Sequence, residues 1–361
     1  MDPLPNIANQ EENREDNEGS DVDVNESSAK EFPEALKVCE KLIDKNAYIL
    51  HLAATKVTHP NIAAALTNHI VEVYHFHKGF QLSALFDHGT KQIVDLQFSE
   101  ENDNLLWTAT HGGPISLWDL RVPYNSVSSY TDTTDDKEDK DRKINCFDIS
   151  LNGRIICAGT DAFEGDAFLL YWDIRKSKLI GGFWESHRDD ITQVKFHPTE
   201  TNKMLSGSTD GLINSYDLNI SGENNALIES MNTESSVEKI SWSKFGSREI
   251  VTCITHTAHI QLWRNVGVYP YCNFTRADLA RNLKRTSANH VYIVDMYQQS
   301  KRNSLIIAGS NVNNGSCVRG LRLERKSLKP AFSLPNNPQR IRCSWYNEND
   351  KLLLTGGEKD T

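Results

Sequence analysis

The end of one apolar run, LLYWDI at residues 169–174, recurs in similar form along most of the chain. The related phrases are VEVYHF (71–76), ISLWDL (115–120), INSYDL (213–218), IQLWRN (260–265) and VRGLRL (318–323). Their spacing is near the ~40–45 residues of a four-stranded repeat unit, with two longer gaps. Each phrase follows a run containing small residues, and each of those runs follows a strand with alternating apolar residues, such as ITQVKFH. This pattern predicts one antiparallel β-unit repeated several times.

The most complete unit is HRDDITQVKFHPTETNKMLSGSTDGLINSYDL, residues 187–218. It contains a His, a strand, a turn with Pro, a strand ending in Ser-Gly-Ser, an Asp-Gly turn and a strand ending in Tyr-Asp. The unit resembles the WD40 repeat family, whose namesake dipeptide occurs here as Trp118-Asp119 and Trp172-Asp173. The resemblance implies an all-β fold, a seven-bladed WD40-type β-propeller.

The same resemblance implies a hydrogen-bonded tetrad of His187, Ser206, Asp210 and Tyr216. Polar groups buried between strands must satisfy one another, so we interpret this tetrad as structural. Other units depart from the pattern. Gly112 occupies the Asp position in the second, and Cys253 and Thr257 replace Ser and Asp in the fifth, so those tetrads should be incomplete.

The expected propeller covers residues 34–361, with six full blades and a partial seventh. Residues 341–361 supply the first two strands of the seventh blade, and residues 35–43 (ALKVCEKLI) are expected to form its outermost strand. The third strand is missing from the sequence, which leaves the seventh blade incomplete at the C-terminus. We therefore expect this chain to be a shortened form or an incomplete gene model.

The segment 1–33 is acidic, because residues 1–30 hold nine carboxylates against Arg14 and Lys30. With few large apolar groups, it is expected to be disordered. The rest of the chain is nearly neutral, which makes nucleic acid an unlikely partner. No apolar run reaches the ~18 residues of a membrane span, and the N-terminus lacks a secretory signal. Seven scattered cysteines suit a reducing compartment, so we expect a soluble protein of the cytoplasm or nucleus.

No motif for nucleotide binding, zinc binding or nucleophilic catalysis is present. We therefore expect no enzyme activity, no cofactor, no metal and no small-molecule substrate. His75 and His77 share a strand face and could ligate a metal, but an exposed strand edge is the better interpretation. An enzyme on this fold would need carboxylates or histidines from separate blades that converge on the central channel.

Two regions on one face of the expected ring could bind a protein. Residues 132–143, with Asp161, Glu164 and Asp166, could form an acidic patch for a basic peptide, although a solvated insertion is the simpler interpretation. Residues 275–287 predict a short helix capped by Thr275 and held by Leu279 and Leu283. The cations of this helix that could serve docking include Arg281 and Lys284.

The opposite face is expected to carry Arg121 and Arg175, each at the end of a W-D-x-R phrase with Asp119 or Asp173. In many WD40 proteins such a pair of phrases docks the adaptor of a cullin-RING ubiquitin ligase. Alternatively, each Asp pairs with its own neighbours. The main functional prediction is a non-catalytic protein interaction scaffold, with a ligase substrate receptor as the alternative.

Overall fold

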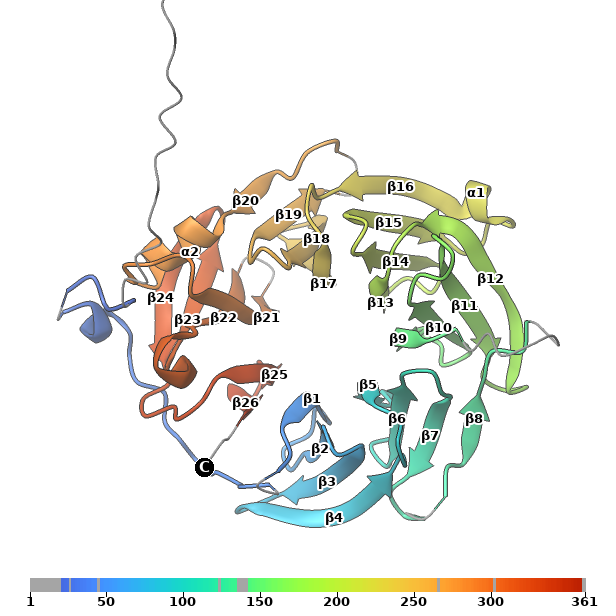
Figure 1. The fold of residues 1–361 in the computed structure, drawn as a ribbon, viewed down its shortest axis with the longest axis horizontal. Coiled ribbons are helices and arrows are strands. Elements are labelled where there is room, and N and C mark those ends of the chain that lie inside the picture. The colour runs from blue at the N-terminus through green and yellow to red at the C-terminus, as the bar shows by residue number, and fades with distance from the viewer. Residues whose placement is uncertain are drawn as a thin grey trace, which may run out of the picture.

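The computed structural model describes residues 21–25, 27–43, 46–122, 125–134, 142–264, 267–300 and 303–358. Their strands form antiparallel sheets arranged in a ring, as a β-propeller (Figure 1). In each sheet the strands follow chain order from the central channel to the rim. The repeat predicted from the sequence is therefore the repeat of the fold.

Six sheets are four-stranded blades. Blade one is β1 (Ile49–Ala54), β2 (Asn61–Leu66), β3 (Ile70–Phe76) and β4 (Phe80–Asp87). Blade two is β5 (Ile93–Phe98), β6 (Leu105–Thr110), β7 (Ile115–Asp119) and β8 (Ser128–Tyr130). Blade three is β9 (Ile144–Ile149), β10 (Ile155–Thr160), β11 (Ala167–Asp173) and β12 (Lys178–His187).

The second half of the ring repeats this order. Blade four is β13 (Ile191–Phe196), β14 (Lys203–Ser208), β15 (Leu212–Asp217) and β16 (Leu227–Asn232). Blade five is β17 (Val237–Phe245), β18 (Arg248–Thr255), β19 (Ile260–Arg264) and β20 (Cys272–Phe274). Blade six is β21 (Val291–Ser300), β22 (Asn303–Ser310), β23 (Cys317–Glu324) and β24 (Ser327–Ser333).

The structure corrects the expected count of seven blades to six. The last sheet, β25 (Ile341–Asn347) with β26 (Leu352–Gly357), has two strands, which lie where the sequence predicted them. Residues 35–43 were expected to be the outermost strand of this sheet, and that expectation is wrong. Within the described residues nothing pairs with the outer edge of β26, so an extended segment at 35–43 has no neighbouring strand to bind.

Blades pack through small residues in their second strands, which are buried along almost their whole length. A Cβ on Gly159 would lie 2.3 Å from Ile191 Cγ2, and one on Gly207 would lie 2.7 Å from Val237 Cγ1. In both cases the glycine leaves room for the first residue of the next blade. This explains why small residues recur before each W-D-like phrase.

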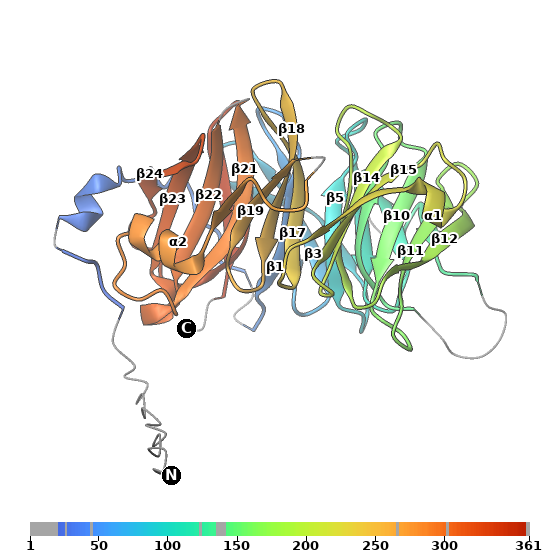
Figure 2. The same cartoon turned by 90° about the horizontal axis from the view of Figure 1, so that it is seen from above.

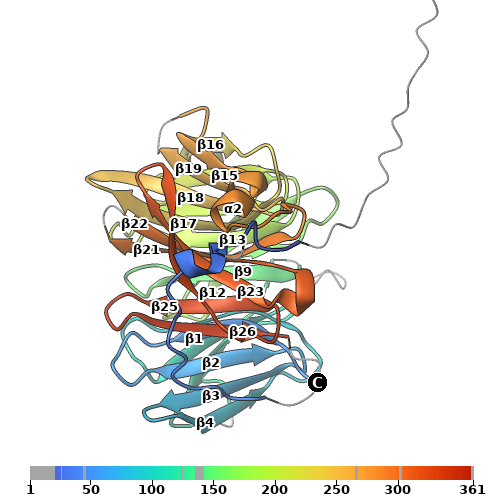
Figure 3. The ribbon, with the colours of Figure 1, turned by 90° about the vertical axis from the view of Figure 1, so that its left-hand side faces the viewer.

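Residues 21–34 have a defined place against blade six, which differs from the disorder that composition predicts for residues 1–33. Figure 3 shows this segment, which includes the 3-10 helix Ser28–Glu31, across the outside of the blade. Phe32 joins the apolar cluster between blades five and six. Asp21 forms a buried ion pair with Arg285, and the partly exposed Asp23 pairs with Arg285 and Arg319. Residues 1–20 lie outside the described part of the chain.

The two faces of the ring carry different loops. The top face has the turns between second and third strands and the connections between blades, and the bottom face has the remaining turns. The helix α2 (Arg276–Asn282) lies on top, opposite the β17–β18 turn (Figure 2). Two other short helices are α1 (Glu223–Ala226) and the 3-10 helix Val312–Gly315. No helix among the described residues is long and apolar enough to cross a membrane.

Candidate interaction surfaces

The four tetrad residues of blade four lie together. His187 Nδ1 is 3.0 Å from Asp210 Oδ2, and His187 Nε2 is 2.6 Å from Ser206 Oγ. The Ser206 hydroxyl lies 3.3 Å from the hydroxyl of Tyr216. Burial would raise the pKa of Asp210, but hydrogen bonds and charge from His187 hold that pKa below its ordinary value. The group ties the end of β12 to β14 and β15, which is a structural role.

Blade two has an incomplete version of this tetrad. His88 Nε2 and the indole Nε1 of Trp118 each lie 2.9 Å from Thr108 Oγ1. Gly112 stands where blade four has Asp210, and His88 Nδ1 is buried with no hydrogen-bond partner among the described residues. Because blade two lacks this carboxylate, His88 Nδ1 has no acceptor. The tetrad is therefore incomplete, as the sequence predicts.

The two W-D-x-R phrases have the same geometry in adjacent blades. Arg121 Nη2 lies 2.6 Å from Asp119 Oδ2, and Arg175 Nη2 lies 3.0 Å from Asp173 Oδ2. Both arginine side chains remain about three-fifths exposed on the bottom face, at 64% and 61%. Hydrogen bonds from the Arg121 side chain lower the pKa of Asp119 to about 2. Each arginine is thus held by its own phrase and is still accessible.

The acidic residues on the top face are partly neutralised by neighbouring blades. Asp161 Oδ2 lies 2.9 Å from His111 Nε2 of blade two, and Asp166 pairs with Arg188 at the start of blade four. Glu164 adopts a positive φ of 55° in the same turn. Of the loop 132–143, residues 135–141 lie outside the described part, and Asp132 pairs with Arg142 at 2.8 Å. The patch is therefore less negative than its sequence suggests.

The predicted helix on the top face forms as α2. Thr275 caps it through a capping box with Asp278, and Leu279 and Leu283 are buried below it. Arg281 is exposed and pairs with Asp278 at 3.1 Å. Lys284 lies 3.1 Å from Glu31 of the N-terminal segment. Both expected docking cations thus pair with carboxylates of the chain itself, and Arg281 remains largely exposed.

Charged side chains converge on the central channel, as a catalytic site on this fold would require. Asp148 Oδ2 accepts a hydrogen bond from the Phe196 amide of the next blade at 2.7 Å. Gln193 Oε1 likewise accepts a hydrogen bond from the Ile240 amide of the next blade at 2.6 Å. Burial raises the pKa of Asp95 and Asp148, although the charge of Lys195 opposes this shift.

Further along the channel, another polar side chain contacts the innermost strand of the next blade. The ammonium of Lys239 lies 2.8 Å from both the Val294 carbonyl and Asp295 Oδ2. Each of these contacts joins the innermost strands of consecutive blades. The converging polar groups therefore cross-link the ring, and structural ion-pair networks of this kind also perturb pKa values.

Comparison with known proteins agrees with this geometry. Residues 178–217 match the family model "WD domain, G-beta repeat". The chain contains a WD40 repeat and folds as a β-propeller. It is 28% identical over 273 residues to "WD repeat-containing protein 89 homolog" of Dictyostelium discoideum, covering 75% of this chain and 69% of that protein. From the sequence alone, the phrase HRDDITQVKFHP at 187–198 and the helix-like segment 276–285 predict the same narrower resemblance.

Two further relatives are WD-repeat proteins. One is "WD repeat-containing protein GTS1" of Arabidopsis thaliana, 28% identical over 71% of this chain and 63% of that protein. The other is "Uncharacterized WD repeat-containing protein YNL035C" of Saccharomyces cerevisiae, 40% identical over 26% of this chain and 25% of that protein. The match with GTS1 covers less than two thirds of that protein's length.

Among the described residues of the propeller, one group has the composition of a metal site. His197, Glu200 and Glu249 place their ligand atoms within 4.8 Å of one another. His197 Nδ1 accepts hydrogen bonds from the amides of Thr199 and Glu200, so Nε2 carries the proton and donates it to Glu249 at 2.6 Å. Lys203 lies between the two carboxylates, 3.0 Å from Glu200 and 3.6 Å from Glu249. The cluster is therefore satisfied by its own hydrogen bonds and charges.

The histidines of the sequence HFH lie at the end of β3 in blade one. His77 Nδ1 is 3.2 Å from a ring nitrogen of His59, and His75 Nδ1 is 3.2 Å from Asn61 Oδ1. His75 and His77 therefore contact different partners. His75 pairs with Asn61 of β2 and with Gln81 of β4, so it lies on an inner strand and the interpretation of an exposed strand edge is wrong for this residue.

Sequence reasoning missed a basic cleft on the bottom face, between blades five and six. Four cations line it, and they come from three turns far apart in the chain: Arg248, Arg264, Arg325 and Lys326. No single motif contains them. The one signal in the sequence is that all three turns belong to the same face once strand order is known.

Proposed function

We propose that this protein is a non-catalytic scaffold that holds protein partners on the faces of its propeller. The observation that carries the proposal is the cross-linked channel. Asp148 and Lys239 each hydrogen-bond the innermost strand of the following blade. Polar groups that could serve chemistry are engaged in holding the ring, and a rigid ring presents its loops at a low entropic cost of binding.

Proximity labelling in cells tests this proposal. The chain is fused to a promiscuous biotin ligase, and labelled proteins are identified by mass spectrometry and confirmed by reciprocal purification. We expect a defined set of proteins that is enriched over the ligase alone. The variant Asp148→Asn should keep the same set because it retains the shape of the side chain. Recovery of no protein above the ligase background would contradict a scaffold function.

A second candidate function is a substrate receptor of a cullin-RING ubiquitin ligase. It is favoured by the equivalent, exposed positions of Arg121 and Arg175 on one face of adjacent blades. A planar guanidinium can form paired hydrogen bonds across an interface. Capture of the ligase adaptor should be lost in Arg121→Ala/Arg175→Ala. The matched control Lys176→Ala/Lys178→Ala removes the same charge nearby. Equal capture by both double variants would remove this candidate.

A further inference from the structure

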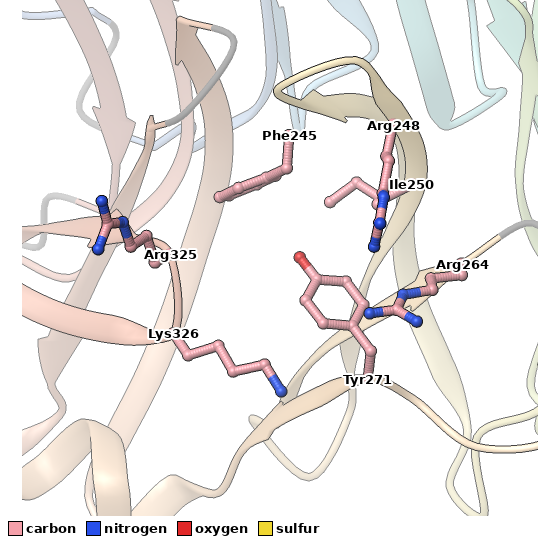
Figure 4. Close-up of a pocket in the computed structure, with 7 residues that line it drawn as sticks. All are labelled: Phe245, Arg248, Ile250, Arg264, Tyr271, Arg325 and Lys326. Atoms are coloured by element: carbon pink, nitrogen blue, oxygen red, sulfur yellow. The ribbon is translucent and has the colours of Figure 1, made fainter.

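The basic cleft between blades five and six combines three unusual features. It has a volume of about 350 Å³ and is open to the bottom face. Its lining consists of Phe245, Arg248, Ile250, Arg264, Tyr271, Arg325 and Lys326 (Figure 4). No carboxylate belongs to this lining, and no ion pair of its four cations occurs among the described residues. The cleft is therefore a concentration of positive charge in a chain whose formal net charge is −10.

Tyr271 is at the centre of the cleft. Figure 4 shows its hydroxyl directed between Phe245 and Arg248, with Lys326 on the other side of the ring. This hydroxyl is buried and has no hydrogen-bond partner among the described residues. Burial raises the pKa of Tyr271 to about 12, against the opposing charge of Arg264, so the phenol keeps its proton at neutral pH. The cleft thus holds an unused hydrogen-bond donor beside unpaired cations.

The aromatic ring itself is occupied by cations. The Arg264 guanidinium carbon lies 5.4 Å from the ring centroid of Tyr271, and Lys326 Nζ lies 5.5 Å from it. A nucleic acid bound here would need an open aromatic face for base stacking and a wider positive field along its backbone. The acidic net charge of the chain opposes the second requirement. The ligand that fits is a compact anion on a side chain.

We propose that this cleft binds a phosphorylated side chain of a protein partner. A phosphate monoester carries about −1.5 to −2 charges at pH 7 and three strong acceptor oxygens, which a single carboxylate does not match. Arg248 and Lys326 supply the charge, and the Tyr271 hydroxyl donates to one oxygen. The assignment rests on the proposed scaffold function and adds to it the chemistry of one partner.

The experiment measures retention of the purified full chain on immobilised degenerate peptide libraries. The libraries have a fixed central phosphoserine, phosphothreonine, phosphotyrosine, serine or glutamate. We expect at least one phosphorylated library to retain roughly tenfold more protein than the serine and glutamate libraries. A serine hydroxyl has no negative charge to pair with the cations, and a glutamate carboxylate has less charge and fewer acceptor oxygens than a phosphate. The phosphorylated library that retains most identifies the residue class. Equal retention on all five libraries would overturn the proposal.

Variants separate the cleft from general charge. Arg248→Gln/Lys326→Gln should reduce retention to the level of the serine library, and Tyr271→Phe should reduce it several-fold. Lys176→Gln/Lys178→Gln loses the same charge on the same face and should bind like wild type. Equal loss in both double variants would overturn the proposal, as would stronger capture on an RNA oligonucleotide that also depends on the cleft. If proximity labelling still finds partners, either result rejects the phosphate site alone and not the scaffold.

Discussion

Ile49 of blade one packs against Gly356 of β26, where a Cβ would lie 2.7 Å from Ile49 Cγ2. Elsewhere in the ring, Gly159 contacts Ile191 and Gly207 contacts Val237 in the same way. The two-stranded sheet therefore meets blade one as a full blade meets its neighbour. The ring closes on itself by this packing between innermost and second strands.

The variant Gly356→Ala should destabilise the ring. Its new methyl group would lie 2.7 Å from Ile49 Cγ2 and 2.9 Å from Cys343 Sγ, which is closer than packed atoms approach, so both neighbours would have to shift. Overpacking of this kind costs about 1–3 kcal/mol of the free energy of unfolding. Urea denaturation measures the loss. The control Gly79→Ala has no atom within 4 Å of its new Cβ and should be nearly neutral. A cost for Gly356→Ala no larger than for Gly79→Ala would contradict packed closure.

The propeller and its strand order could be predicted because they are local and repeated. Alternating strands, small-residue runs and W-D phrases recur within each unit, and the Thr275 cap with Leu279 and Leu283 lies within one short helix. Residues 35–43 have a strand-like pattern too, but a strand forms only where a neighbour offers hydrogen bonds. That neighbour is a property of the tertiary structure and not of the segment.

The same distinction holds for the candidate sites: contacts within one short segment could be predicted, and contacts between distant segments could not. The pairing of Arg121 with Asp119 follows from a spacing of two residues at a strand end, and the sequence already offered it as an alternative. The basic cleft joins Arg248 to Lys326 through the contact between two blades. Similarly, Asp21 and Asp23 were read as part of a disordered acidic segment, because their partners Arg285 and Arg319 are remote in the chain.

The variant Asp210→Ala should lower the free energy of unfolding more than the equivalent change in blade five does. Removal of the Asp210 carboxylate leaves His187 Nδ1 and the Arg188 amide without their acceptor. An unsatisfied buried donor costs about 1–3 kcal/mol, which chemical denaturation can resolve. Thr257 occupies the same turn position in blade five, is exposed and bonds only to other hydroxyls. Thr257→Ala should therefore cost well under 1 kcal/mol, as is usual for surface changes. Similar losses of unfolding free energy in the two variants would show that the tetrad contributes little to stability.

Native alkylation should distinguish one cysteine from the others. The described structure places all seven cysteines as free thiols, with Cys39 exposed. Burial raises the pKa of Cys253 and Cys343 to about 12, and it raises that of Cys146 further. Because the thiolate is the reactive form, iodoacetamide at pH 8 should modify Cys39 first. Mass spectrometry of tryptic peptides follows the order. Modification of Cys146 or Cys253 before unfolding would contradict the burial seen here.

The attachment of residues 21–34 to blade six should depend on pH through Asp21. Burial alone would raise the pKa of Asp21, but hydrogen bonds from Ser310, the Ser287 amide and Arg285 outweigh it and lower that pKa below 3.8. A carboxyl group with a lowered folded pKa stabilises the attached state fully above its unfolded pKa of 3.8. This stabilisation is lost as the pH falls from 3.8 through the folded value, because the detached state binds the proton more readily than the attached state.

Hydrogen exchange followed by mass spectrometry, corrected for the intrinsic rate at each pH, measures this attachment. The amides of Val22 and Val24 donate to Thr286 Oγ1 and the Lys284 carbonyl, so they report directly on the contact. In the wild type their peptide should lose protection below pH 3.8, before the peptide that covers β22. Asp21→Asn/Asp23→Asn should lack that protection already at pH 6, since removing one partner of a buried ion pair costs about 3–5 kcal/mol. The exposed control Glu100→Gln should follow the wild type. Equal protection in the double variant at pH 6 would mean that Phe32 and its apolar contacts hold the segment without the ion pairs.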